Sequence, residues 1–164
     1  MRILLVAVAF VAVSLTAFSQ SYIFDKGSMS IAGGVGFSSM SSGGSSVTSL
    51  YLSPTAGFFV IRNLEVGASL SITSFSGSGA STSSTFIGPY ARYYFTEGRP
   101  ILAPFLGAGL GITSSGGASS TGITLTGGAA YVVAKNVTID GALYFRSGDV
   151  STIGLAVGVG VFIW

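Results

Sequence analysis

The sequence predicts an all-β fold: an eight-stranded antiparallel up-and-down transmembrane β-barrel preceded by a cleavable signal peptide. Of the 164 residues, 49% are apolar and only 7% are charged, whereas about a quarter of an ordinary soluble domain is charged. After residue 20, the longest apolar runs contain 12 residues, at 101–112 and 153–164. A spanning helix needs about 20. Apolar residues also alternate with small or polar ones, and a closed barrel is the other structure that satisfies every backbone group in hydrocarbon.

The N-terminal segment predicts export. Arg2 precedes an apolar stretch over residues 3–18, and the small residues Ala17 and Ser19 flank a cleavage point, which is the pattern of a secretory signal peptide. The alternative, a membrane-spanning helix, is disfavoured because a stretch of 16 residues is short for a bilayer core of roughly 30 Å. The sequence therefore predicts a signal peptide over residues 1–19 and one transmembrane barrel domain over residues 20–164.

Residue composition excludes most catalytic chemistry. The sequence contains neither His nor Cys, which argues against hydrolases with an imidazole base, thiol redox chemistry, zinc or haem sites and disulfides. The net charge is only +2 and no basic run is present, so nucleic acid is not an expected partner. We expect a protein that is not an enzyme and that has no cofactor and no metal site.

Clusters of Gly, Ser and Thr divide the chain into eight strands. Four clusters predict long connections, at 38–46, 76–84, 113–121 and 146–151. Three tighter turns are expected between them, at 61–63, 96–99 and 134–136. The predicted strands are 28–38, 48–60, 64–75, 85–95, 101–113, 122–133, 137–146 and 152–164. Each is long enough to cross a bilayer when tilted, which takes about 9 to 11 residues.

Alternation within the strands assigns an outward and an inward face. In the second strand the outward set is Leu50, Leu52, Pro54, Ala56, Phe58 and Val60. A charge that faces lipid costs up to about 2 to 4 kcal/mol at mid-bilayer, and the charged residues of the strands all have inward parity: Glu65, Arg92, Asp140 and Arg146. Glu65, Arg92 and Asp140 each lie near a short turn, so we expect them to meet as a structural interior ion cluster. The alternative is a gate or a proton path.

Aromatic residues occupy both faces. Four of them, Phe58, Tyr93, Phe95 and Tyr131, point outward near the short turns, where an interfacial girdle belongs; the alternative is ordinary packing in a soluble sandwich. Seven rings point inward: Tyr51, Phe59, Phe75, Tyr90, Tyr94, Phe105 and Tyr144. Because an eight-stranded barrel is just wide enough for its side chains to fill, we expect a filled interior with at most small water pockets. The Ser/Gly-rich loops of about 5 to 9 residues are expected to be passive.

Several segments resemble the small eight-stranded outer-membrane β-barrel proteins of diderm bacteria, the OmpA/OmpX-like family. They are Lys26-Gly27-Ser28, the run from Pro54 to Val60 with the following Arg62-Asn63-Leu64, the runs from Gly88 to Phe95 and from Ala103 to Gly109, and the aromatic C-terminus. The resemblance implies location in the bacterial outer membrane, surrounded by its lipid. It also implies insertion by the barrel-assembly machinery after periplasmic chaperones, with the last strand, ending in Phe162 and Trp164, as the assembly signal.

Two points about the last strand stay open in the sequence. Gly158 and Gly160 stand where the family's assembly signal has large apolar residues. Alternation turns Trp164 inward unless a bulge shifts it.

These features favour a non-enzymatic outer-membrane barrel, expected as a monomer, with a role in envelope structure or surface interaction. The alternative is a narrow channel or transporter for small or hydrophobic molecules. A third interpretation is an exported soluble lipocalin-like carrier, which should carry charge on its outer face.

Overall fold

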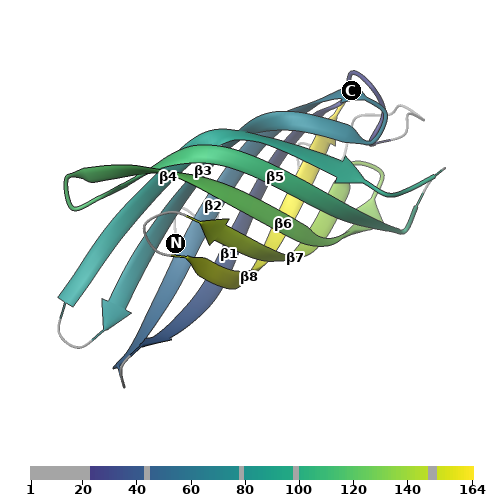
Figure 1. Cartoon of the computed structure of the whole chain (residues 1–164). Helices are drawn as coiled ribbons and strands as arrows, with labels where there is room; N and C mark the ends of the chain where they lie inside the picture. Colours follow the sequence, from purple (N-terminus) through teal and green to yellow (C-terminus); the bar gives the residue numbers. More distant parts are fainter. Residues whose placement is uncertain (1–22, 43–44, 78–79, 98–99, 148–150) are drawn as a thin grey trace, which may run out of the picture.

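The chain folds into a closed barrel of eight antiparallel strands (Figure 1). A computed structural model describes residues 23–42, 45–77, 80–97, 100–147 and 151–164, with the backbone alone described at 37–42, 45–48, 75–77 and 80–82. The strands are β1 (Met29–Ser42), β2 (Ser45–Ile61), β3 (Leu64–Gly77), β4 (Ala80–Tyr94), β5 (Leu102–Ser115), β6 (Ala118–Ala134), β7 (Val137–Ser147) and β8 (Thr152–Ile163). The predicted eight-stranded fold is confirmed. The predicted signal peptide lies outside the described residues.

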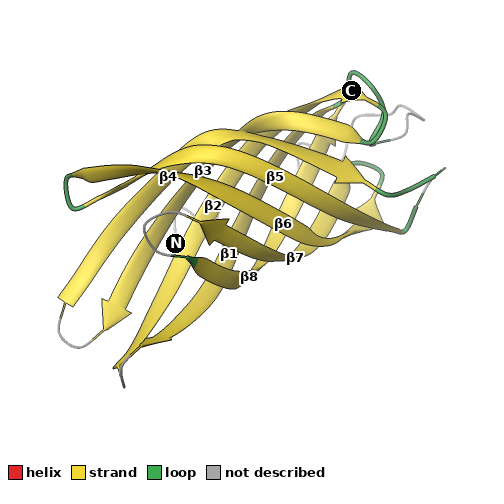
Figure 2. Ribbon diagram, in the orientation of Figure 1, coloured by secondary structure: helices red, strands yellow, loops and turns green. Residues whose placement is uncertain are grey.

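Each strand pairs with the next, and β8 closes the barrel onto β1. That last ladder runs from the pair Phe37 and Leu155 to the pair Met29 and Ile163. Figure 2 draws the described residues as strands joined by loops and turns. Within the same residues, the chain forms no helix with the length and hydropathy of a membrane span.

Side chains of outward parity give the barrel an apolar outer surface. On β5, Leu102, Leu106 and Leu110 are between 55% and 59% exposed, whereas the inward Phe105 is 3% exposed. Exposed apolar side chains recur on all eight strands. A continuous surface of this kind is compatible with lipid and unfavourable in water.

Three of the four long connections expected from the Gly/Ser/Thr clusters, at 38–46, 76–84 and 113–121, are wrong, whereas the fourth, at 146–151, is confirmed to within two residues because β7 ends at Ser147 and β8 begins at Thr152. Most of those residues lie in strands, and three of the four hairpins have only two residues between their strands: Ser42 to Ser45, Gly77 to Ala80, and Ser115 to Ala118. Ser and Thr join an antiparallel ladder as readily as other residues, and only the two turn positions need special backbone angles. Gly116 and Gly117 have φ values of +57° and +86°, as a type I′ hairpin turn requires. We call this end of the barrel the hairpin end.

The opposite end, which we call the turn end, holds the connections at 62–63, 95–101 and 135–136. Asn63 adopts a φ of +67°, a conformation that Asn tolerates better than most residues. The tight turn expected at 96–99 is wrong in length, since β4 ends at Tyr94 and β5 begins at Leu102. Pro100 lies in this segment and has no N–H to donate to a ladder. The first described residues and Trp164 also lie at the turn end, beside the pair Met29 and Ile163.

Candidate functional site

An aromatic plug closes the barrel interior at the turn end. Its rings are Phe24, Phe59, Tyr94, Phe105 and Phe162, all at most 3% exposed. Phe24 stacks on Tyr94 with ring centroids 4.3 Å apart and meets Phe162 edge-on at 5.4 Å. Ring pairs at such distances add to the stabilisation that burial itself provides. The plug therefore seals this end of the interior with directly packed rings.

Phe24 comes from the segment that precedes β1, not from a strand. The segment is held by backbone bonds: the N–H of Gly27 donates to the carbonyl of Phe59 (2.9 Å), and the N–H of Asn63 donates to the carbonyl of Phe24 (2.7 Å). Sequence reasoning missed this residue because period-two alternation applies only within strands. The available signal was the apolar pair Ile23-Phe24 directly before the turn-forming Asp25-Lys26-Gly27.

A polar layer lies next to the plug. Glu65, 1% exposed, accepts hydrogen bonds from the hydroxyls of Ser30, Tyr90 and Tyr94. The Tyr90 hydroxyl is 2.5 Å from Glu65 Oε1, and the Tyr94 hydroxyl is 3.1 Å from Oε2. Three hydroxyl donors from the two strands β1 and β4 thus satisfy a carboxylate that water cannot reach, as a buried polar group requires.

The structure brings Glu65, Arg92 and Asp140 together. The Nη1 atom of Arg92 lies 4.0 Å from Glu65 Oε2 and 4.0 Å from Asp140 Oδ2. Its guanidinium also lies over the ring of Phe105, 4.7 Å from the centroid. The arginine is thus held between two acids on the floor of the open part of the interior. Among the residues that the structure describes, no group of three metal-ligating side chains gathers in one place.

Above this polar layer, the interior toward the hairpin end is hollow. A cavity of about 560 Å³ begins at Arg92 and Asp140 and reaches Ser115 and Ala118, the residues that flank the turn at the hairpin end. The prediction of an interior with at most small water pockets is therefore wrong for this half and holds only for the plugged half. Phe75, one of the seven rings expected inside, has no described side chain.

The cavity exists because inward rings lie over glycines. A Cβ atom on Gly36 would stand 1.9 Å from Tyr51 Cε1, one on Gly154 would stand 2.5 Å from the Tyr144 hydroxyl, and one on Gly111 would stand 2.3 Å from Phe86 Cζ. Gly36 is the direct cross-strand partner of Tyr51, and Gly154 is that of Tyr144. Rings that occupy the space of a missing side chain lie close to the wall and leave the lumen open.

Arg146 is a second cation inside the barrel, in its hollow half. Its guanidinium lies 4.1 Å from the ring centroid of Phe86, and its Nε atom donates to Thr124 Oγ1 at 3.3 Å. Nearby, the rings of Tyr51 and Tyr144 meet edge-on with centroids 4.9 Å apart. Sequence parity predicts that Arg146 points inward, and its nearness to Asp149 suggests a solvated or cross-loop ion pair rather than a ligand site; Asp149 lies outside the described residues.

Comparisons with known proteins extend this description. No protein-family model and no curated protein matches the sequence, but solved structures match the fold. The crystal structure of Neisserial surface protein A has a TM-score of 0.65, with 22% identity, over 83% of this chain and 97% of that one. The N-terminal β-barrel domain of OprF from Pseudomonas aeruginosa gives 0.63, with 18% identity, over 84% and 98%. The outer membrane protein OprG from the same species gives 0.67, with 12% identity, over 87% and 99%.

This chain has the fold of the small outer-membrane β-barrels. At these identities the likeness extends to the fold, so the roles of individual residues rest on the geometry above.

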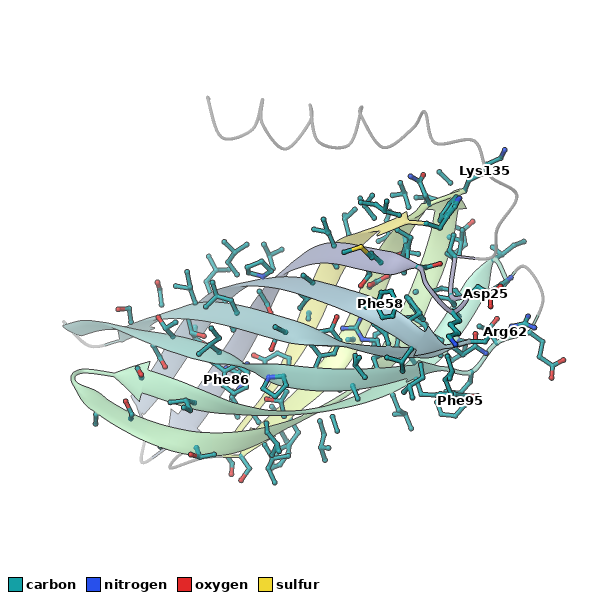
Figure 3. All side chains as sticks on the ribbon, turned by 90° about the horizontal axis from the view of Figure 1, so that it is seen from above. Asp25, Phe58, Arg62, Phe86, Phe95 and Lys135 are labelled. Carbon is teal, nitrogen blue, oxygen red and sulfur yellow. The ribbon has the colours of Figure 1, made fainter. Side chains whose placement is uncertain are left out.

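In a barrel of the outer-membrane type, aromatic residues mark the interface between lipid and water. The four expected girdle residues point outward at the turn end and are 41% to 53% exposed: Phe58, Tyr93, Phe95 and Tyr131. Figure 3 shows Phe58 and Phe95 at the same end as the charged residues Asp25, Arg62 and Lys135. The placement fits an interfacial girdle, and that role stays a prediction.

The last strand of this outer-membrane-type barrel keeps its alternation to the end. Leu155, Val157 and Ile163 face outward, whereas Phe162 is 3% exposed and belongs to the plug. Trp164 packs against the same interior cluster. The register that the sequence left open is thus inward for Trp164, and the role of Phe162 and Trp164 in assembly stays a prediction.

Proposed function

We propose that this protein is a non-enzymatic integral protein of the bacterial outer membrane, with a role in envelope structure or surface interaction, and that its lumen is a blind cavity and not a pore. The observation that carries the proposal is the plug, in which Phe24, Tyr94 and Phe162 meet ring to ring across the turn end. The apolar outer surface supports membrane insertion, since it would be costly to hydrate. It also argues against the soluble lipocalin-like carrier.

We infer the orientation from the strands that extend to the hairpin end, because connection length does not decide it: the connections there have two to four residues, and those at the turn end have two or seven. Outer-membrane barrels extend further on the extracellular side, so we place the turn end and the plug on the periplasmic side. The hairpin end, where β2 and β6 are the longest strands at 17 residues each, then faces the outside of the cell. In this orientation the cavity is accessible from outside and sealed from the periplasm.

A second candidate is the narrow channel, and the cavity of about 560 Å³ favours it. For a solute to pass, however, the segment that carries Phe24 would have to leave the plug, and the layer of Glu65, Arg92 and Asp140 would have to open. Both are held by several bonds, among them the two backbone bonds at Gly27 and Asn63. We therefore favour a barrel that does not conduct solutes and whose cavity is closed at the turn end.

Partners during biogenesis follow the same proposal. We expect the chain to cross the periplasm with chaperones, to be inserted by the barrel-assembly machinery and to remain a monomer surrounded by lipid. The barrel-assembly machinery would recognise Phe162 and Trp164 as the assembly signal before these residues pack at the turn end.

Two measurements test the proposal. The first is gel mobility of unboiled and boiled protein from isolated outer membranes; a folded barrel shifts on boiling, and extraction by salt alone would contradict the membrane assignment. The second is current across planar bilayers that contain the purified barrel, with a wide general porin as the positive control. We expect no stepwise conductance, and regular steps would establish the channel instead.

A further inference from the structure

The two arginines inside the barrel differ in how their charges are balanced. Arg92 lies 4.0 Å from each of two carboxylates. Arg146 has no carboxylate within ion-pair distance among the described residues; its contacts are the ring of Phe86 and the hydroxyl of Thr124. The nearest acidic residue in sequence, Asp149, lies outside the described residues. A cation held in a partly apolar cavity favours an anion beside it.

Arg146 lies inside the cavity rather than on the outer surface. It belongs to β7, whereas Phe86, whose ring it covers at 4.1 Å, belongs to β4. Because β5 and β6 separate these strands in the barrel, the two side chains meet on the lumen side of the wall, where the Phe86 ring lies over Gly111 of β5. The bond from Nε to Thr124 Oγ1 and the ring contact together fix the plane of the guanidinium, which pre-organises it for a planar acid group.

The surroundings of Arg146 suit a ligand with one polar end and an apolar body. Tyr51 and Tyr144 line the same cavity as Arg146. Of the other described residues that line it, fourteen are Ser or Thr and ten are Gly or Ala, and these small side chains leave room for an apolar body. The volume of about 560 Å³ is within the range of pockets that hold small molecules, about 300 to 1,000 Å³.

We propose that the cavity binds a small amphipathic carboxylate, with its acid group paired to Arg146 and its apolar body along the Gly/Ala wall. Of the two guanidiniums that line the cavity, only that of Arg92 has described carboxylates beside it. The remaining one, on Arg146, matches a monoanion, and a carboxylate can accept two parallel hydrogen bonds from it. The inference rests on the proposed function, because it needs a folded barrel whose cavity is accessible at the hairpin end. The polar layer at Arg92 is the floor of this site, and its own carboxylates exclude a second acid group there.

The test compares an acid with a neutral molecule of the same shape. The full-length mature barrel in lipid nanodiscs is titrated with 2-naphthoate and with 2-naphthalenemethanol, with empty nanodiscs as the control for partition into lipid. We expect saturable naphthoate binding that is at least about tenfold tighter than binding of the alcohol, since a charge-assisted pair replaces a neutral contact. Equal binding of the two compounds, or none above empty nanodiscs, overturns the proposal.

Variants of Arg146 test whether the carboxylate of the ligand binds at this residue. Arg146→Gln should weaken naphthoate binding by about tenfold or more and leave alcohol binding unchanged. The matched control is Arg62→Gln, which removes an exposed cation at the turn end and should leave both affinities unchanged. Arg146→Lys keeps the charge without the planar fork and should bind with intermediate affinity. Unchanged naphthoate affinity in Arg146→Gln contradicts the assignment.

Folding of each variant is checked by heat-modifiable mobility. If Arg146→Gln does not fold, Arg146→Lys and the acid-to-alcohol ratio of the wild type still decide. If the folded barrel shows no conductance and binds naphthoate no more tightly than the alcohol, this inference alone is overturned. Stepwise conductance would overturn the blind cavity on which the inference rests.

Discussion

The two halves of the barrel interior contain similar inward rings but use them in opposite ways. At the turn end the rings contact one another, with Phe24 4.3 Å from Tyr94 and 5.4 Å from Phe162. Toward the hairpin end, Tyr51 and Tyr144 lie over Gly36 and Gly154. Tyr51 and Tyr144 also contact each other, with centroids 4.9 Å apart, but each occupies the space of a side chain that its glycine lacks, which leaves the lumen beside them open. What separates the sealed half from the hollow half is thus the added ring of Phe24 at one end and the glycine partners of the rings at the other, and not the number of rings alone.

The polar layer separates the two halves, and its disruption should have the largest effect. In Arg92→Met, the carboxylates of Glu65 and Asp140 lose the cation that lies 4.0 Å from each. Loss of one partner from a buried ion pair costs about 3 to 5 kcal/mol, so we expect a decrease in the free energy of unfolding of that size. Urea unfolding in lipid vesicles, followed by gel mobility, measures it.

The control for Arg92→Met removes the acids as well. The triple variant Glu65→Gln, Arg92→Met, Asp140→Asn leaves no buried charge in the layer, and it should recover most of the lost stability. If the triple variant were less stable than Arg92→Met, the layer would stabilise the barrel through its hydrogen bonds more than through charge balance.

The next prediction compares one ring from each half. Phe59→Ala removes a fully buried ring from the plug and should cost about 3 to 5 kcal/mol, the usual range for such a truncation. Phe86 is also buried, but its ring borders an existing cavity and contacts chiefly Gly111 and Arg146. Phe86→Ala should therefore cost less than Phe59→Ala. Urea unfolding read by the fluorescence of the single Trp164 measures both, and equal costs would refute the distinction between packed and open halves.

The sequence predicted the parts of this structure that depend on local pattern. Alternation in β5 places Leu102, Leu106 and Leu110 outside. Inward parity, together with a position near a short turn, brings Glu65, Arg92 and Asp140 to one layer. The faces follow from the period of two along a strand, and the common height follows from the distance of each residue to its turn. The outer surface and the ion cluster were therefore predictable without the register of any strand pair.

The rest depended on relations between strands or lay outside them. That Tyr51 lies over Gly36 follows only when the β1–β2 register is known, so counting inward rings suggested a filled lumen. Gly and Ser favour turns, but Ser114 and Ser119, which lie in the predicted connection at 113–121, pair within the β5–β6 ladder, so composition alone exaggerated the connections. Phe24 lies before the first strand, where no periodicity assigns a face.

Glycine substitutions sharpen the comparison with a smaller effect. In Gly36→Ala, the new Cβ would stand 1.9 Å from Tyr51 Cε1, so the ring must turn into the lumen. Such overpacking costs about 1 to 3 kcal/mol, and the displaced ring should also reduce the volume of the cavity. Gly33→Ala on the same strand is the matched control, since nothing lies within 4 Å of its Cβ position. We expect no measurable change there, and equal destabilisation of the two variants would show that strand propensity, not ring contact, sets the cost.

The smallest effect is expected where the open half leaves a polar group without a protein partner. Ser71 Oγ is buried and has no hydrogen-bond partner among the described residues, whereas Ser69 Oγ on the same strand donates to the carbonyl of Gly88 at 3.3 Å. Ser71→Ala removes a group whose burial is not compensated, and we expect its free energy of unfolding to stay within about 0.5 kcal/mol of wild type. Ser69→Ala loses a neutral hydrogen bond and should cost about 0.5 to 1.5 kcal/mol. Chemical denaturation of both variants in the same vesicles resolves the order, and a larger loss in Ser71→Ala would mean that its hydroxyl is bonded inside the lumen after all, which would make that part of the wall polar in function as well as in composition.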